Sequence, residues 1–308
     1  MKTPVSHAEK ARLMRLATYA STATAATLIT AKLAAWLWTD SVSILATLID
    51  STLDVAASLF NMLAVRHALS PADKEHRFGH GKAEALAGLA QAAFIAGSAC
   101  FLLLEAIIRF FHPQSVEVIH IGIGVMVFSI VATLLLLGFQ NHVIRQTNST
   151  AIKADALHYR TDLLVNGSVI AALLLAAYGW SGFDSLFAIG IAVFILYSAW
   201  GIAQESIADL MDRELPDEER QRIHDVVLSH KHVKGMHDLR TRRAGTTTFI
   251  QLHLELDDDL TLKHAHAISD AVEAMIRKAY PDSEIIIHED PASLVEPAKS
   301  FDEDAQAS

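Results

Sequence analysis

Long apolar segments dominate the first two-thirds of the chain and predict membrane helices. Six segments are almost free of charge, and they cover residues 17–38, 41–65, 84–108, 116–139, 163–179 and 183–204. Each is close to the ~20 residues that a helix needs to cross a hydrocarbon core. The first is too long for a signal peptide and lacks a convincing cleavage site, so we interpret it as a helix too. We expect a tail of residues 1–11 and a six-helix transmembrane domain of residues 12–209.

The pattern becomes charged and soluble after about residue 210. The expected elements are a helix at 216–230, strands at 233–243 and 246–256, a helix at 262–280 and a strand at 283–288. The Ala244-Gly245 pair is a hairpin signal between the first two strands. We expect a small α+β domain of residues 210–291 in α-β-β-α-β order, followed by a disordered polar tail at 292–308.

The second of these strands alternates apolar and polar residues. Four apolar side chains of this strand share one face and point to the core: Ile250, Leu252, Leu254 and Leu256. The opposite face presents Phe249, Gln251, His253 and Glu255.

Basic residues concentrate in every second connection between the membrane segments. They are Lys2, Lys10, Arg12 and Arg15; Arg66, Lys74, Arg77 and Lys82; and Arg145, Lys153 and Arg160. The other connections, near 39–40, 112–117 and 179–184, are almost free of them, with Arg109 as the nearest exception. Because basic loops stay on the cytoplasmic side, we expect both termini in the cytoplasm.

Composition and charge narrow the function further. The chain is 52% hydrophobic and carries a net charge of −10, of which −9 lies in residues 210–308, with 12 Lys/Arg against 21 Asp/Glu. An acidic cytoplasmic domain argues against nucleic acid as a partner and against docking on anionic lipid. The single cysteine, Cys100, excludes a disulfide within the chain, and we expect it to be a small core residue.

Polar side chains recur along one face of two expected helices. In the second segment they are Ser43, Thr47, Asp50, Asp54, Ser58 and Asn61. In the fifth they are Asp155, His158, Asp162 and Asn166. Intervals of three or four residues mark one helix face, and the other four segments carry few such residues. We expect the two stripes to face each other and line an internal path.

The stripes place four metal-ligating side chains at similar depth. With ~1.5 Å per residue, Asp54 and Asp50 lie roughly 18 and about 24 Å from the cytoplasmic helix end near Arg66. Counted from helix-capping residues at 149–150, His158 and Asp162 lie about 14 and about 20 Å along the antiparallel fifth helix.

Three carboxylates and an imidazole suit a divalent transition metal in tetrahedral geometry. The ion offsets the repulsion between the carboxylates, and protons can replace it when it leaves. This predicts exchange of a metal ion for H⁺ at one site, with His158 as the group that titrates most naturally near neutral pH. The alternative is a structural polar cluster, although charged groups inside a membrane are functional by default.

Two further groups of residues have metal-ligand character. The connection after the second helix contains D-x2-H-x3-H at Asp73, His76 and His80, and Gly79 and Gly81 favour a loop there. Three expected strands of the soluble domain each supply a histidine, namely His237, His253 and His288. A helix histidine such as His266 could join them in a site bridged by a carboxylate, and solvated surface histidines are the alternative.

The sequence resembles the cation diffusion facilitators, and among them a bacterial branch of zinc/proton antiporters that are also called ferrous-iron efflux proteins. The stretches that carry the resemblance are DSVSILATLIDSTLD, HRFGHGKAEALA, LHYRTDLLVNG, LMDRELPDEER and IIIHEDP. The resemblance implies six transmembrane helices and a metallochaperone-like (ferredoxin-like) cytoplasmic domain. It also implies a homodimer in the cell inner membrane, paired through metal.

The resemblance assigns roles to individual residues. The implied transport site is Asp50, Asp54, His158 and Asp162. The implied loop site is Asp73, His76 and His80. The implied cytoplasmic binuclear site is His237, His253, His266, His288 and Asp290, next to which Glu289 adds a further carboxylate. A charge interlock is implied between Lys82 and Asp212, near the dimer interface.

We interpret the chain as a secondary transporter and not an enzyme. It would export Zn²⁺ from the cytoplasm by alternating access, with protons as the counter-ion and Zn²⁺ as a structural ion in the soluble domain. Cd²⁺, Fe²⁺, Mn²⁺ and Co²⁺ are not excluded by this donor set. One alternative is a membrane metal sensor that binds Zn²⁺ without transporting it. Another is an intramembrane metal hydrolase, which the lack of an H-E-x-x-H motif and of an open metal position disfavours.

Overall fold

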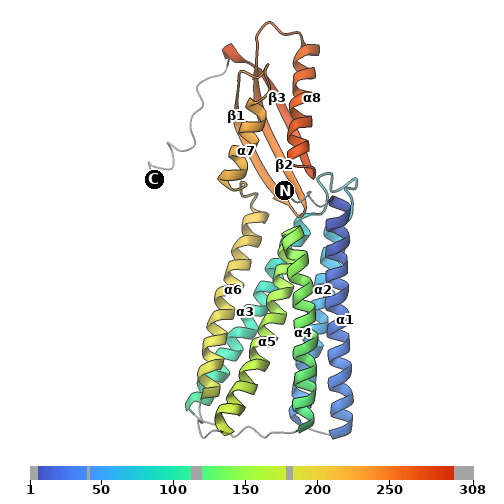
Figure 1. The fold of residues 1–308 in the computed structure, drawn as a ribbon, viewed down its shortest axis with the longest axis vertical. Coiled ribbons are helices and arrows are strands. Elements are labelled where there is room, and N and C mark those ends of the chain that lie inside the picture. The colour runs from blue at the N-terminus through green and yellow to red at the C-terminus, as the bar shows by residue number, and fades with distance from the viewer. Residues whose placement is uncertain (1–5, 40–41, 112–119, 178–182, 295–308) are drawn as a thin grey trace. The chain divides into compact units, whose positions relative to one another are not determined.

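The chain folds into two compact units that meet in sequence at Leu210, as Figure 1 shows. The computed structural model describes residues 6–39, 42–111, 120–177 and 183–294. The outer connections expected near 39–40, 112–117 and 179–184 lie largely outside these residues. So do the first five residues and the tail from residue 295 onward.

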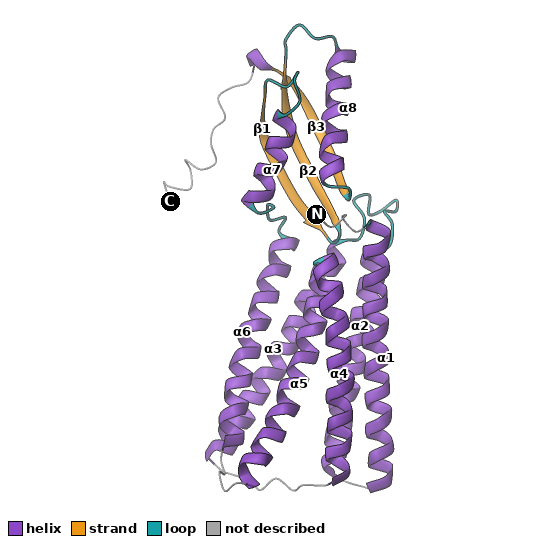
Figure 2. Ribbon diagram, in the orientation of Figure 1, coloured by secondary structure: helices purple, strands orange, loops and turns teal. Residues whose placement is uncertain are grey.

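The first unit is a bundle of long helices that run side by side (Figure 2). They are α1 (His7–Thr39), α2 (Val42–Ala68), α3 (Lys82–Phe111), α4 (His120–Thr147), α5 (Thr150–Ala177) and α6 (Phe183–Leu210). Within the described residues, three stretches are long and apolar enough to cross a membrane: Lys82–Ile108, Gly124–Thr147 and Ser185–Leu210. The remaining helices include α2 and α5, which carry the polar stripes, so the crossing of all six stays a prediction.

The two helices that carry the polar stripes, α2 and α5, pack mainly on other helices of the bundle and little on each other. The most extensive contacts join α3 to α6 and α1 to α2, while α5 packs on α3, α4 and α6. In contrast, α2 and α5 meet over few residues. Gly88 allows α3 to approach α5 and α6 closely, because a Cβ at that position would lie 2.8 Å from Ser206 Oγ and 3.0 Å from Thr150 Cγ2.

Helix ends follow local capping rules. The start of α5 is as expected, because Ser149 Oγ accepts a hydrogen bond of 3.2 Å from the backbone N–H of Ile152. The first helix begins earlier than its apolar segment, at His7. There the backbone N–H of Glu9 donates to Ser6 Oγ over 3.3 Å, so the tail expected at residues 1–11 is partly helical.

The expectation that Cys100 belongs to the core is wrong. This residue is exposed in the single chain. On α3 the buried small residues Ala92, Ala99 and Ala106 recur every seven positions and form the packed face. Cys100 follows Ala99 directly and therefore points about 100° away from that face.

The second unit has the predicted α-β-β-α-β order. Its elements are α7 (Asp217–Leu228), β1 (Gly235–Ala244), β2 (Thr247–Leu256), α8 (Leu262–Ala279), β3 (Ser283–Pro291) and a short 3₁₀ turn (Ala292–Leu294). The sheet order is β1-β2-β3, with β1 antiparallel and β3 parallel to β2. The hairpin turn contains Gly245 in the left-handed region with φ 59°, where glycine has no steric cost.

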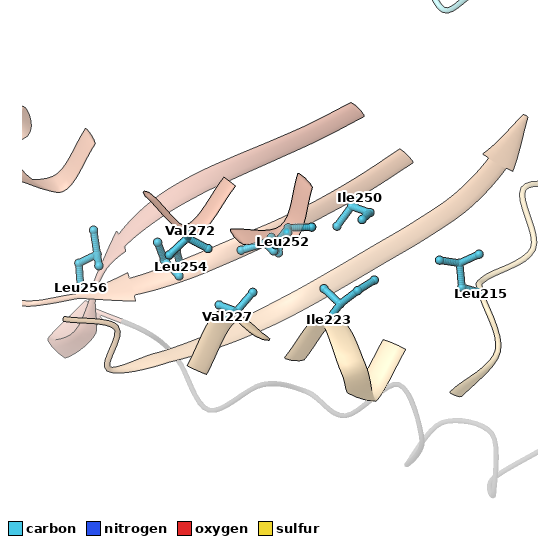
Figure 3. Close-up of a cluster of buried hydrophobic side chains, with 9 residues drawn as sticks. Leu215, Ile223, Val227, Ile250, Leu252, Leu254, Leu256 and Val272 are labelled. Carbon is cyan, nitrogen blue, oxygen red and sulfur yellow. The ribbon is translucent and has the colours of Figure 1, made fainter. Parts of the chain in front are cut away.

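The core of this unit lies on one face of the sheet. Leu252 and Leu254 of β2 pack against Ile223 of α7 and against Val272 of α8 (Figure 3). Because side chains alternate along a strand, the residues between these leucines project from the opposite face. That face is where the histidines of the strands lie, as expected.

Candidate metal sites

The first candidate site joins the two polar stripes inside the helical unit. His158 Nε2 of α5 lies 3.1 Å from Asp54 Oδ1 of α2 and 3.8 Å from Asp162 Oδ2, one turn along α5. One donor atom from each of these three residues lies within 4.8 Å of the others. Zn–N and Zn–O bonds of about 2.0–2.1 Å in a tetrahedron put neighbouring donors about 3.3 Å apart. The three side chains therefore stand at distances that suit one divalent ion.

Burial differs across this cluster. The side chain of His158 is 8% exposed, against 17% for Asp54 and 31% for Asp162. The fourth predicted ligand, Asp50, is exposed and is not part of the three-residue group, although its carboxylate is within electrostatic range of Asp54 and His158. The structure thus brings together three of the four predicted ligands.

A fully buried polar layer lies next to the cluster, towards the C-terminal end of α2 and the N-terminal end of α5. Ser58 Oγ is 3.2 Å from Ser21 Oγ and 3.0 Å from Tyr159 Oη, and Tyr159 Oη donates to the carbonyl oxygen of Ser21 over 3.0 Å. One turn further, Gln140 Nε2 donates to Asp155 Oδ2 over 2.6 Å. These polar groups come from α1, α2, α4 and α5.

The polar layer shows what the sequence pattern missed. Ser21 of α1 and Gln140 of α4 belong to helices that were expected to contribute few polar side chains. Ser21 stands among threonines and Gln140 beside Asn141 and His142, so neither belongs to a periodic stripe of acidic residues and histidines like those of α2 and α5. Only the packing of α1 and α4 on the central pair reveals them. Since this layer is buried while Asp162 is partly exposed, the site is closed off on the side of the layer.

The second candidate site lies in the connection between α2 and α3. Asp73 Oδ1 is 3.3 Å from His76 Nδ1, and Asp73 Oδ2 is 3.3 Å from His80 Nε2. Both distances match the donor spacing of about 3.3 Å at a tetrahedral ion. Gly79 has φ 79°, a left-handed conformation that turns the loop back on itself and brings His80 beside Asp73.

Backbone donors keep the carboxylate of this loop site ionised. The N–H of His76 donates to Asp73 Oδ1 over 2.6 Å and that of Glu75 donates to the same atom over 2.9 Å. These hydrogen bonds, led by the one from His76, hold the pKa of Asp73 below its ordinary value. The loop therefore presents an anionic oxygen between two imidazoles.

A third imidazole beside the loop site was not predicted. The ring of His67, in the last turn of α2, lies 4.6 Å from the ring of His80, which in turn lies 4.7 Å from that of His76. In the sequence, His67 stands six residues before Asp73. The end of α2 lies between the two residues, so the short spacing of Asp73, His76 and His80 gave no reason to include His67.

The third candidate site is a row of histidines across the sheet. Strand register pairs His237 of β1 with His253 of β2, and His253 with His288 of β3. The carboxylate of Asp290 reaches all three, with Oδ2 2.7 Å from His253 Nδ1 and 3.5 Å from His237 Nε2, and Oδ1 3.3 Å from His288 Nε2. One carboxylate between imidazoles is the arrangement that a carboxylate-bridged metal site requires.

Of two carboxylates near this row, Glu255 extends the predicted ligand set and Glu289 does not. Glu255 Oε1 lies 3.0 Å from His237 Nδ1, so Glu255 is a further candidate ligand that the alternation of β2 had placed on the same face as His253. Glu289, which was expected to add a carboxylate, belongs to no group of candidate ligands among the described residues.

The structure does not bring His266 into this site. His266 is exposed on α8 and its Nε2 lies 3.6 Å from Asp270 Oδ2. Because α8 covers the core face of the sheet, His266 and the histidine row lie on opposite sides of it. Within one chain the structure does not bring His266 to the row, so its part in the site stays a prediction.

Comparison with known proteins decides the family. Residues 18–211 match the model of the cation efflux transmembrane domain, and residues 215–292 match that of the cation efflux protein, cytoplasmic domain. The chain belongs to the cation efflux family. The resemblance to the cation diffusion facilitators and the predicted fold class are thereby confirmed.

Similar proteins span nearly the whole chain. It is 51% identical over 284 residues to the cation-efflux pump FieF of Salmonella agona (strain SL483), covering 92% of this chain and 95% of that protein. It is 50% identical over 288 residues to FieF of Klebsiella pneumoniae, covering 94% and 96%. Among solved structures, the metal-bound C-terminal domain of the CzcD transporter from Thermotoga maritima is 29% identical, with a TM-score of 0.25, covering 27% of this chain and 100% of that chain.

As a member of the cation efflux family, the chain is a membrane transporter of metal cations. The interlock implied between Lys82 and Asp212 would join its two units. Lys82 Nζ donates to the carbonyl oxygen of Leu210 over 3.2 Å inside the first unit, and Asp212 Oδ1 lies 3.4 Å from an Arg242 guanidinium nitrogen inside the second. The interlock itself stays a prediction.

Proposed function

We propose that this cation efflux protein exports Zn²⁺ from the cytoplasm in exchange for protons. The observation that carries the proposal is the group of His158, Asp54 and Asp162, in which donor atoms from two helices stand 3.1 and 3.8 Å apart. A mixed nitrogen and oxygen donor set suits a borderline-soft ion such as Zn²⁺. Asp50, adjacent on α2, would complete four ligands once the ion is bound.

The exchange of Zn²⁺ for protons would proceed by alternating access, in which the site opens first to one side of the membrane and then to the other. The helices that hold the site, α2 and α5, share few contacts, so one can move against the other without breaking an extensive interface. The buried layer of Ser21, Ser58 and Tyr159 would close the site to the cytoplasm in one state and open in the other. Protons that occupy the carboxylates and His158 would offset the charge on the return step.

The cytoplasmic unit would hold structural Zn²⁺ and pair two copies of the chain. This unit matches the cytoplasmic domain of cation efflux proteins, a domain family whose name refers to a dimer. His266 faces away from the histidine row of its own chain, so if it is a ligand as the resemblance implies, it acts on the row of a second copy. We place the homodimer in the inner membrane with both termini in the cytoplasm, on the basis of the basic connections.

A flux assay tests the function. Purified protein in proteoliposomes with an imposed pH gradient should accumulate Zn²⁺, and Asp54→Ala should abolish the accumulation. A matched control is Asp217→Ala, because Asp217 is 95% exposed on α7 and lies in the other unit. Uptake that ignores the pH gradient would exclude antiport, and binding without any flux would favour the membrane sensor instead. Repeating the assay with Cd²⁺, Fe²⁺, Mn²⁺ and Co²⁺, in wild type and in His158→Asp, tests whether the imidazole sets the preference for Zn²⁺.

A further inference from the structure

A lysine lies deep within α1, beside the acidic site. Lys32 is seven residues from the end of α1 at Thr39, which corresponds to about 10 Å along the helix. Its ammonium group donates to Ser51 Oγ over 2.5 Å and to the carbonyl oxygen of Thr47 over 3.3 Å, both on α2. The Lys32 side chain is thus held against the helix that carries Asp50 and Asp54.

This position differs from that of a lysine which merely reaches the membrane surface. A lysine near a helix end normally extends its ammonium group to the interface, where water solvates it. Here the ammonium group instead bonds to Ser51, whose side chain is buried. Ser51 directly follows Asp50 and precedes Asp54 by one helical turn. Lys32 is accordingly one of the charges that act on the carboxylates of both Asp50 and Asp162.

The charges of the site do not balance without this lysine. Asp50, Asp54 and Asp162 carry three negative charges when ionised, and a divalent cation supplies two positive charges. His158 is neutral when it binds a metal through its ring nitrogen. One uncompensated charge would therefore remain in a region of low dielectric, where it is costly.

We propose that Lys32 is a fixed counter-charge of the transport site, which makes the site neutral when a divalent cation is bound and keeps that cation releasable. The inference rests on the proposed function and deepens it. Lys32 acts through the carboxylates and does not bind the ion itself, so it is a positioning residue. It favours divalent ions as the class of substrate, because a monovalent ion would leave the site with a net negative charge.

Lys32 also bears on Asp50, which lies outside the three-residue group. The ammonium group is hydrogen-bonded to Ser51, the residue next to Asp50, and acts electrostatically on the carboxylate of Asp50. An arriving ion must compete with this charge for the carboxylate, and it also experiences repulsion from the ammonium group. Both effects lower the affinity and speed the release of the ion.

Removing the charge of Lys32 should therefore tighten binding and slow transport. Lys32→Gln keeps a donor for Ser51 and Thr47 but carries no charge. We expect its KM for Zn²⁺ uptake in proteoliposomes to fall at least about tenfold, since a unit charge acts on a divalent ion at short range in a medium of reduced dielectric. The maximal rate should fall as well, because release becomes slow. Lys32→Arg, which retains the charge, should stay within about threefold of wild type in both quantities.

The controls separate this inference from loss of folding and from the proposed function. Lys10→Gln removes the same charge from the same helix about 33 Å away, and its KM should not change. An unchanged or higher KM in a folded Lys32→Gln protein overturns the role of the charge. If Lys32→Gln does not fold, a tenfold shift in the KM of Lys32→Arg overturns it instead. Absence of Zn²⁺ flux in the wild-type protein refutes the proposed function itself.

Discussion

The transmembrane and cytoplasmic clusters use the same donor chemistry on different scaffolds. His158 and its two aspartates come from two helices with few mutual contacts. His237, His253 and His288 come from three strands whose backbones are hydrogen-bonded in one continuous register. A ligand set shared by two helices with few contacts to each other can be taken apart by a small movement of one helix against the other, whereas a hydrogen-bonded sheet fixes its row. The comparison suggests that the first scaffold suits an ion in transit and the second an ion that stays.

The solvation of the two clusters supports the same distinction. In the membrane cluster the imidazole is nearly buried, so an ion must lose its water there and be compensated by ionised side chains. In the cytoplasmic row the side chains of His237 and Asp290 are only partly buried, and Glu255 adds a further carboxylate at 3.0 Å. An ion bound to the row would therefore keep more contact with water beside its imidazole ligand His237 than the nearly buried His158 allows.

The largest expected effect comes from replacing one ligand in each cluster and comparing the Zn²⁺ flux of the two variants. Asp162→Asn keeps the size of the side chain but removes its charge, and it should lower Zn²⁺ uptake by more than about 100-fold because the ion loses a ligand and its compensation. His253→Asn, in the sheet, should leave uptake within about threefold of wild type at saturating Zn²⁺. Initial rates in proteoliposomes measure both. Equal losses in the two variants would mean that both clusters lie on the transport path.

A smaller effect is expected on the stability of the cytoplasmic unit. That unit has its own hydrophobic core, so residues 211–308 can be studied alone. Zn²⁺ at about 100 times its Kd should raise Tm by roughly 10–20 °C for a domain of this size. His253→Asn should lose at least half of that rise, because it removes the central ligand of the row.

His264→Asn is the control for the stability measurement. His264 is exposed on α8, where its ring contacts Thr261 rather than the histidine row. Its Zn²⁺-dependent rise in Tm should match that of the wild-type unit. A rise that survives in His253→Asn would place the bound ion elsewhere in the domain.

Much of this comparison could be predicted from sequence because its causes are local. Apolar segments gave the long helices, and alternation in β2 gave the face on which His253 lies. The spacing of Asp54 on one helix and of His158 and Asp162 on another, combined with antiparallel helices of known rise, was enough to predict that they come together. These inferences need only helix and strand geometry.

The remainder depends on contacts between distant residues. Strand register decides that His237, His253 and His288 form one row, and nothing within any single strand specifies that pairing. The packing of α8 on the core face of the sheet decides that His266 lies away from the row of its own chain. Lys32 has a long, flexible side chain, so its sequence position did not reveal that it turns to α2 rather than to the membrane surface.

The smallest expected effect concerns the loop site, whose ligands come from a single connection and not from two helices or three strands. His67 lies at a helix end and its ring is 4.6 Å from that of His80, so rotation of its exposed side chain would bring a fourth donor to Asp73, His76 and His80. We expect His67→Ala to weaken Zn²⁺ binding at this site by about tenfold. The measurement is a competitive Zn²⁺ titration in protein that also carries Asp162→Asn and His253→Asn. His142→Ala, which removes an exposed histidine of α4, should leave the affinity unchanged. The same affinity in His67→Ala as in this control would reduce the loop site to three ligands, the open form suited to rapid exchange of its ion.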